Sequence, residues 1–174
     1  MPDYGHLAEA IRDVPDFPKP GILFKDITTL IQKAGFFSEV IDIFYERYRE
    51  SGVDKVIGIE ARGYLFASAL AYRLKAGLVP IRKPGKLPAE TVSISYELEY
   101  GTDSVEMHKD ALAPDDRVLL IDDLLATGGT AEASCKLIRN QGAELVSVAF
   151  LVELDFLKGR DRLEDIDIFT IVHF

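Results

Sequence analysis

The sequence predicts an α/β fold built on a parallel sheet, and three observations support this class. Residues 118–121 form a short apolar run, Val-Leu-Leu-Ile, which is typical of a strand buried on both faces. A glycine-containing turn and then a helical pattern follow this run over residues 126–140. Residues 53–82 show the order strand, turn, helix and strand, which implies a right-handed crossover between parallel strands.

The overall composition limits the classes of function. The chain has 174 residues, of which 48% are hydrophobic, so we expect a single domain over residues 1–174 with a sizeable core. No apolar run approaches the roughly 20 residues of a membrane span, and no signal peptide is visible, so we expect no membrane partner. The net charge of −9 disfavours nucleic acid as a partner.

Cysteine and histidine are too sparse to suggest covalent or metal cross-links. The single cysteine, Cys135, cannot form an internal disulfide, which fits a reducing cytoplasm, and we expect a cytoplasmic protein with a buried thiol. His6, His108 and His173 lie far apart without ligand-like spacing. We therefore expect no histidine metal site.

The elements before and after these strands can be assigned in order. Apolar residues at spacings of three and four predict a helix over residues 4–14. Pro15, Pro18 and Pro20 then stiffen an extended segment, for which a plain linker is the alternative interpretation. A charged loop or short helix near the end, over residues 157–166, has acids and bases that we expect to be solvated. The remaining predicted elements are helices at 36–50 and 64–75 and strands at 53–60, 78–82, 143–154 and 167–174.

Residues 91–110 predict a β-hairpin. Residues 91–100 alternate as a strand, Gly101-Thr102-Asp103 make a turn, and residues 104–109 return. Alternation places Glu97 and Glu99 on one side of the first strand, and Tyr96, Leu98 and Tyr100 on the other. A polar hairpin that closes over a site acts as a lid.

The stretch from Val118 to Thr130, VLLIDDLLATGGT, carries the chemistry. Asp122 and Asp123 stand at the carboxyl end of the apolar run, where their carboxylates suit the hydroxyls of a sugar. Gly128 and Gly129 let backbone N–H groups turn inward, and the helix start adds its positive dipole end, so an anion fits there. Glycine-rich turns are often purely structural, but a double acid in such a turn is rarer. The stretch therefore predicts a site for a phosphorylated ribose, although it is neither a P-loop nor a GxGxxG motif.

Basic residues at two further strand ends are candidate contacts for an anionic substrate. Arg82, Lys83 and Lys86 follow the strand at 78–82, and an anionic substrate of an acidic protein requires such a local cluster of positive charge. Arg62 follows the strand at 53–60, at the edge where open α/β sheets bind ligands. A solvated turn is the alternative interpretation of each.

The stretch VLLIDDLLATGGT resembles the phosphoribosyl-diphosphate signature of the type I phosphoribosyltransferases, and DDLLATGGT is most similar to the adenine phosphoribosyltransferases among them. The resemblance covers nearly the whole chain, through FPKPGILFKD, ARGYLF, IRKPGKLP, SYELEYG and LVELDFLKGR. It implies a parallel-sheet phosphoribosyltransferase-type fold with a small N-terminal hood, residues 1–34, and a β-hairpin lid, residues 91–110.

The resemblance also implies the reaction and its site. Adenine and phosphoribosyl diphosphate (5-phospho-α-D-ribose 1-diphosphate) would give AMP and diphosphate in a homodimer, with Mg²⁺ carried by the diphosphate and no direct protein ligand assigned. Lys25 stands where the family usually has arginine, and it lacks the planar fork of that residue. The implied catalytic residues are Glu99, Asp122 and Asp123. The implied substrate-binding residues are Leu23, Phe24, Lys25, Arg62, Lys83, Lys86, Tyr100, Leu124, Leu125, Ala126, Thr127, Gly128, Gly129 and Thr130.

Two other functions stay open at this point. A hypoxanthine-guanine or orotate phosphoribosyltransferase would differ in the base pocket, which no periodicity argument reaches. A non-catalytic regulator that senses phosphoribosyl diphosphate would share the fold. The acidic balance and the lack of an added DNA-binding segment argue against such a regulator.

Overall fold

A computed structural model describes residues 4–97 and 102–174, and its centre is a five-stranded parallel sheet. The strand order is β4-β3-β7-β8-β9, and every neighbouring pair is parallel. The predicted α/β class is therefore confirmed. The strands are β3 (Lys55–Ile59), β4 (Gly77–Ile81), β7 (Arg117–Leu125), β8 (Glu144–Glu153) and β9 (Ile168–His173).

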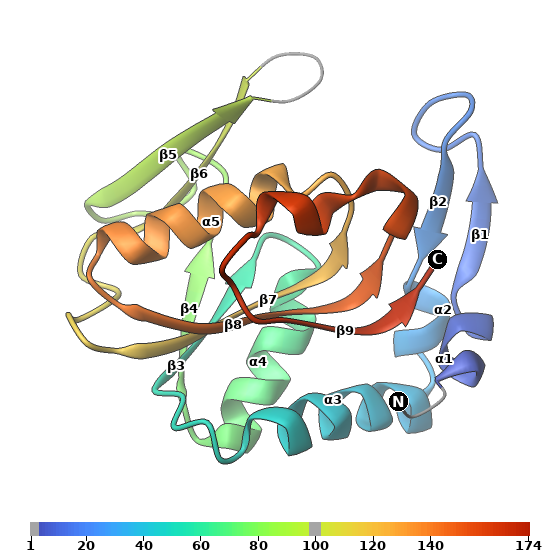
Figure 1. Ribbon diagram of the computed structural model, residues 1–174, viewed down its shortest axis with the longest axis horizontal. Coiled ribbons are helices and arrows are strands. Elements are labelled where there is room, and N and C mark those ends of the chain that lie inside the picture. Colours follow the sequence, from blue (N-terminus) through green and yellow to red (C-terminus); the bar gives the residue numbers. More distant parts are fainter. Residues whose placement is uncertain (1–3, 98–101) are drawn as a thin grey trace.

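Helices cover both faces of this sheet (Figure 1). Helices α3 (Ala34–Tyr48) and α4 (Gly63–Leu74) lie on one face, and α5 (Gly129–Asn140) lies on the other. The apolar run of β7 serves both layers, because Leu119 and Ile121 join the core on the α3 and α4 side while Val118 and Leu120 join the core under α5. A strand that is buried on both faces reads as a continuous apolar run, as this one does.

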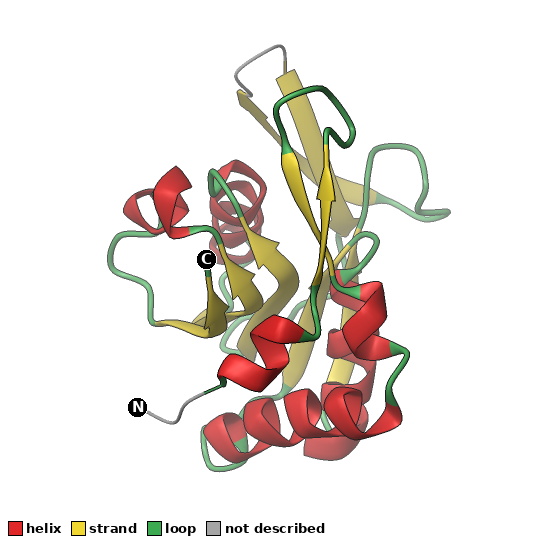
Figure 2. Cartoon of the chain, turned by 90° about the vertical axis from the view of Figure 1, so that its right-hand side faces the viewer, coloured by secondary structure: helices red, strands yellow, loops and turns green. Residues whose placement is uncertain are grey.

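The N-terminal region forms a hood beside the sheet. It contains α1 (Gly5–Glu9), β1 (Arg12–Pro15), β2 (Leu23–Asp26) and α2 (Thr28–Ile31). The predicted helix at residues 4–14 is wrong beyond Glu9, because β1 pairs antiparallel with β2. This pairing is reinforced by the ion pair between Arg12 and Asp26, at 2.5 Å, so tertiary contacts override the local helical pattern. Figure 2 shows the hood strands as a separate ribbon in front of the central sheet.

The predicted hairpin is formed by β5 (Thr91–Glu97) and β6 (Thr102–His108), which pair antiparallel. The predicted turn at residues 101–103 is wrong for Thr102 and Asp103, which belong to the second strand. Asp103 lies opposite Tyr96 and accepts a hydrogen bond from its hydroxyl at 3.1 Å, which favours the longer strand. The hairpin and the hood project from opposite sides of the molecule (Figure 1).

The order of the strands fixes where a ligand can bind. The chain runs outward from β3 to β4 on one side, and from β7 through β8 to β9 on the other, so the topological switch point lies between β3 and β7. Two short 3₁₀ turns, η1 (Asp155–Leu157) and η2 (Gly159–Arg162), connect β8 to β9. Among the described residues, no helix combines the length and the apolar character that crossing a membrane requires.

Candidate active site

The residues that follow β3 and β7 meet at the switch point of the sheet, where open α/β folds bind their ligands. Arg62 follows β3 and occupies the position just before α4, while Asp122 and Asp123 lie near the end of β7. Strand β7 continues to Leu125, so the acids and both leucines belong to the strand rather than to the loop after it. The signature loop therefore begins at Ala126.

The signature loop forms a small neutral cradle at the start of α5. Gly128 precedes the helix with a φ of 84°, in the left-handed region that favours glycine. Among the described residues, no side chain caps this helix, so its first N–H groups are available to an anion. A cavity of about 100 Å³ lies here. Its lining residues are Asp122, Leu124, Leu125, Ala126, Thr127, Gly128, Gly129, Thr130, Ala131 and Phe150.

The two acids of β7 have different environments. The backbone N–H of Asp123 donates to Oδ1 of Asp122 at 2.8 Å, and a Cβ atom added to Gly63 would lie only 2.8 Å from the same oxygen. The start of α4 thus packs directly on Asp122. Desolvation by the surrounding protein, followed by repulsion from the Asp123 carboxylate, raises the pKa of Asp122 well above its ordinary value.

Asp123 is buried and faces Arg62. Its side chain is 6% exposed, and its Oδ2 lies 2.5 Å from Nε of Arg62. This contact lacks hydrogen-bond geometry, so within the described part of the chain Asp123 Oδ2 accepts no hydrogen bond. The charge of Arg62 balances that of this carboxylate, and a ligand hydroxyl would supply the hydrogen bond that its buried oxygen lacks.

The basic cluster after β4 is organised by Glu60, a residue that the sequence analysis did not select. Glu60 accepts hydrogen bonds from Lys86 Nζ at 2.8 Å, from the backbone N–H of Lys83 at 3.0 Å and from Arg82 Nε at 3.3 Å. These donors, with Lys86 first, lower the pKa of Glu60 to about 2. The carboxylate therefore holds the two predicted lysines beside the turn that carries Arg62.

A hydrogen-bond network connects this cluster to the hairpin and to the signature loop. Lys83 Nζ donates to the carboxylate of Asp103 on β6. The hydroxyl of Tyr96 donates to the same carboxylate at 3.1 Å and lies 3.0 Å from Oγ1 of Thr130. The lysine, the hairpin and the start of α5 thus form one polar unit.

Of the predicted hood residues, Phe24 lies at this site, whereas the side chain of Lys25 points to the other face of the hood. Arg62 lies over the ring of Phe24, with Cζ 5.1 Å from the ring centroid, so Phe24 lies beside the arginine that pairs with Asp123. Lys25 is on the opposite side of β2 because successive strand residues alternate. Its Nζ lies 2.6 Å from Oδ1 of Asp13 and 3.7 Å from the centroid of the Phe174 ring. The structure therefore does not bring the Lys25 ammonium together with Phe24, and Leu23 lies at the exposed start of β2.

Two predicted site residues, Glu99 and Tyr100, lie outside the described residues, so their predicted roles stay predictions. Other contributors were missed by sequence reasoning. Glu60 and Asp103 carried no motif signal, and Tyr96 was selected only as a hairpin residue. The charged segment after β8, predicted to be solvated, contains Gly159, which is buried against the signature loop.

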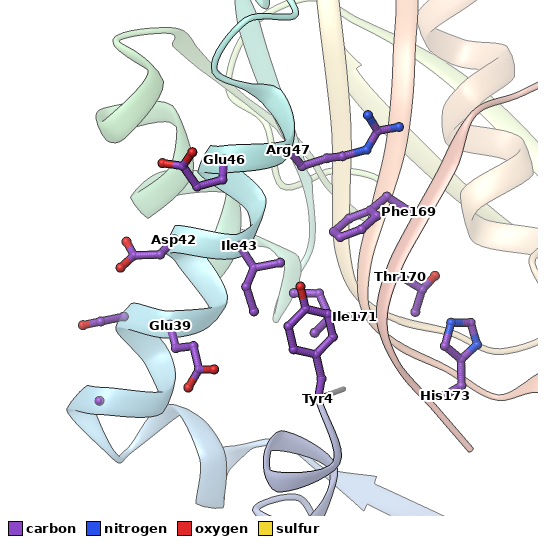
Figure 3. Close-up of a pocket in the computed structure, with 12 residues that line it drawn as sticks. Tyr4, Glu39, Asp42, Ile43, Glu46, Arg47, Phe169, Thr170, Ile171 and His173 are labelled. Carbon is purple, nitrogen blue, oxygen red and sulfur yellow. The ribbon is translucent and has the colours of Figure 1, made fainter. Parts of the chain in front are cut away.

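A cavity of about 820 Å³ forms a separate groove between α3 and β9 (Figure 3). Tyr4, Ile43 and Phe169 point into it, while Asp42 and Glu46 point away on the outer side of α3. None of the described residues that line it belongs to the signature or to the basic cluster. Polar chemistry rather than volume therefore identifies the candidate site.

Comparison with known proteins agrees with this geometry. The family model described as "Phosphoribosyl transferase domain" matches residues 27–173. Adenine phosphoribosyltransferase from Acidobacterium capsulatum is 57% identical, with 97% of this chain and 93% of the relative covered. This chain belongs to the adenine phosphoribosyltransferase family. The family resemblance of the signature is thereby confirmed.

Solved structures of adenine phosphoribosyltransferases share the whole fold. The crystal structure from Thermoanaerobacter pseudethanolicus matches with a TM-score of 0.95 and 50% identity, covering 98% of this chain and 99% of the other. The Saccharomyces cerevisiae enzyme, in complex with an iminoaltritol bisphosphate and adenine, matches with a TM-score of 0.91 and 41% identity. That match covers 96% of this chain and 97% of the yeast chain. The phosphoribosyltransferase-type fold with hood and hairpin is thus confirmed.

Proposed function

We propose that the protein transfers phosphoribose from phosphoribosyl diphosphate to adenine, giving AMP and diphosphate in purine salvage. The buried Oδ2 of Asp123 carries this proposal, since it accepts no hydrogen bond from the described residues and lies beside a cradle built for an anion. A phosphorylated sugar supplies a hydroxyl that can donate to Asp123 Oδ2 and a phosphate that can bind in the cradle. The relatives named for adenine transfer, one of them crystallised with adenine, support the choice of base.

Each part of the substrate has a proposed place. The 5′-phosphate binds residues 126–130 at the start of α5, where backbone N–H groups and the helix dipole favour an anion. The ribose hydroxyls bind Asp122 and Asp123. The diphosphate binds Arg62, Lys83 and Lys86, which follow the carboxyl ends of β3 and β4 in the chain.

The base binds against the hood. Phe24 offers an aromatic face near Arg62, so a purine stacked there lies next to the ribose site. Lys25 holds the hood through Asp13 and Phe174, which makes its proposed contribution to base binding an indirect one.

The chemistry follows from where charge develops. As the bond from the anomeric carbon to diphosphate breaks, the ribose acquires oxocarbenium character, and N9 of adenine forms the new bond. The carboxylates of Asp122 and Asp123 fix the hydroxyls and stabilise the positive charge. Closure of the hairpin excludes water, which competes with adenine for the sugar. On that hairpin, Tyr100 contacts substrate. Adenine binds as its N7–H tautomer, which leaves N9 free to attack, and Glu99 takes the proton from N7 as the bond to N9 forms.

Magnesium fits the donors that the site offers. The carboxylate oxygens of Asp122 and Asp123 are hard ligands of the kind Mg²⁺ prefers, and the ion keeps several of its waters. We assign no direct protein ligand, because Mg²⁺ arrives with the diphosphate and would meet these carboxylates through its waters. When bound, it offsets the negative charge of the leaving group.

The proposed assembly is a homodimer in the cytoplasm, without nucleic acid or membrane partners. Exposed apolar residues on α4 and β4 support self-association: Tyr72 is 88% exposed, Leu65 41% and Leu78 48%. Cys135 is a free, buried thiol, which suits a reducing compartment. Sedimentation should give twice the chain mass of 19.4 kDa, and Tyr72→Glu should shift it towards the monomer.

The proposed function is tested by product analysis. Incubation with adenine, phosphoribosyl diphosphate and Mg²⁺ should give AMP and diphosphate in equal amounts. Binding of phosphoribosyl diphosphate without any turnover would instead identify a sensing regulator.

A further inference from the structure

The signature loop touches the segment after β8 at a pair of glycines. A Cβ atom added to Gly128 would lie 2.4 Å from the carbonyl oxygen of Gly159. A Cβ atom added to Gly159 would lie 2.2 Å from the carbonyl oxygen of Ala126 and 3.0 Å from the nitrogen of Gly128. The two backbones are therefore in direct contact, and the position of Gly159 sets the position of the loop.

Gly159 is held in place by an ion pair on its flank. Arg160 donates through Nε to Oε1 of Glu153 at 3.0 Å and through Nη2 to Oε2 at 2.5 Å. Thr170 on β9 donates its hydroxyl to the same Oε2 at 2.9 Å. Such a two-point contact fixes both the distance and the orientation of the guanidinium group. The residue next to Gly159 is thus anchored to the end of β8 and to the middle of β9.

Burial distinguishes this pair from the other arginine of the segment. The side chain of Glu153 is 6% exposed, whereas the partner of Arg162, Glu132, is 28% exposed and lies 3.4 Å away. Glu153 also lies with Asp155 and His173, whose possible ligand atoms are all within 4.8 Å of one another. Both oxygens of Glu153 already accept hydrogen bonds from Arg160 and Thr170, so we interpret the carboxylate as a support rather than a cation ligand.

We propose that Glu153 and Arg160 are positioning residues for the phosphate cradle. Their ion pair holds Gly159 against Gly128 and Ala126, and so sets the affinity of the signature loop for the 5′-phosphate. Neither residue belongs to the loop, and neither contacts substrate in this account. The inference rests on the proposed function, because it assigns a ligand group to the loop.

The test compares ligands with and without the 5′-phosphate. Glu153→Gln keeps the shape and removes the charge, and Arg160→Lys keeps the charge and removes the fork. Each should raise the KM for phosphoribosyl diphosphate and the Kd for AMP by about tenfold or more, since small misplacements of a binding group are costly. The KM for adenine and the Kd for adenosine should change less than threefold. Arg162→Lys is the matched control and should behave as wild type.

A milder variant separates positioning from general stability. Thr170→Val removes one hydrogen bond to Glu153 and should raise the Kd for AMP by about two- to fivefold, the size of one ordinary hydrogen bond. Equal losses for AMP and adenosine, or a lowered melting temperature with an unchanged Kd for AMP, would overturn the positioning role. A wild-type protein that binds AMP but does not convert adenine would overturn the proposed reaction instead, and AMP binding would still test the ion pair.

Discussion

The Nε atom of Arg62 lies 2.5 Å from Oδ2 of Asp123, which joins the turn after β3 to the acidic pair of β7. The acid is 6% exposed and the arginine 43% exposed, both by side chain. The buried partner is therefore fixed, while the exposed one lies at the solvent side of the site. In the proposed reaction Asp123 binds the ribose and Arg62 binds the diphosphate. Their contact therefore lies beside the bond between ribose and diphosphate, which is the bond that breaks.

Removing either charge of the acidic pair should slow the reaction more than it weakens base binding. Asp122→Asn and Asp123→Asn should each lower kcat, with a smaller change in the KM for adenine, because the carboxylates act on the charge that develops at the sugar. Steady-state kinetics of both variants measure this. Wild-type kcat in both would refute the ribose role.

Asp122 should also limit stability at neutral pH. Its pKa is raised in the folded protein, so the folded state binds its proton more tightly than the unfolded chain does. Below the ordinary pKa of 3.8, Asp122 is protonated in both states and does not lower the free energy of unfolding. As pH rises from there through the raised pKa of the folded protein, the unfolded chain loses this proton first, and the protein loses stability. Asp122→Asn should therefore melt at a higher temperature than wild type, by a margin that widens from pH 4 to pH 8. A constant or narrowing margin would contradict the raised pKa.

Sequence reasoning located the centre of the site but not its supports. The apolar run before Asp122 and the glycines after it identify a strand, a turn and a helix start locally, so the cradle could be predicted. Glu60 and Asp103 could not, because their roles depend on Lys83 and Lys86, which approach them only in the folded chain. Gly159 meets Gly128 across a long sequence separation, and composition alone made its charged neighbours look solvated.

The hood shows a second limit, which is the direction of side chains. The family resemblance implied contacts from Leu23, Phe24 and Lys25 alike, and the interpretation of residues 17–28 as an extended segment gave no direction for their side chains. Once Leu23–Asp26 forms a paired strand, alternation sends Phe24 and Lys25 to opposite faces. The pairing partner, β1, lies inside a stretch whose local pattern is helical. Neither the strand β2 nor the direction of its side chains could therefore be derived from the sequence.

Asp103 should compete with diphosphate for Lys83. The two side chains form an ion pair and are 31% and 39% exposed, respectively. Asp103→Asn removes the competing charge and should lower the KM for diphosphate in the reverse reaction by up to about fivefold, as expected for a partly exposed pair of at most about 1 kcal/mol. Asp110→Asn makes the same change of charge at an exposed loop residue and serves as the control. An unchanged KM in Asp103→Asn would mean that the lysine does not contact the diphosphate.

Glu99 should act as a positioned base, and Glu97 provides the control. Both are glutamates of the same predicted strand face, two residues apart. A general base contributes typically 10²–10⁴-fold, so Glu99→Gln should lower kcat at least about tenfold with a smaller effect on KM. Glu97→Gln should stay close to wild type. Equally small effects of the two variants would mean that Glu99 is an ordinary solvated residue. Equally large effects would mean that the hairpin needs negative charge there rather than a positioned base.

The choice of base tests the central claim most directly. Adenine offers a donor at its amino group and an acceptor at N1, and hypoxanthine reverses both, so a site built for one leaves buried groups mispaired with the other. The measurement is kcat/KM for adenine, hypoxanthine, guanine and orotate with phosphoribosyl diphosphate and Mg²⁺, followed by absorbance. We predict that adenine exceeds each competitor by about 10⁴-fold or more. A comparable kcat/KM for hypoxanthine would contradict the assignment to adenine.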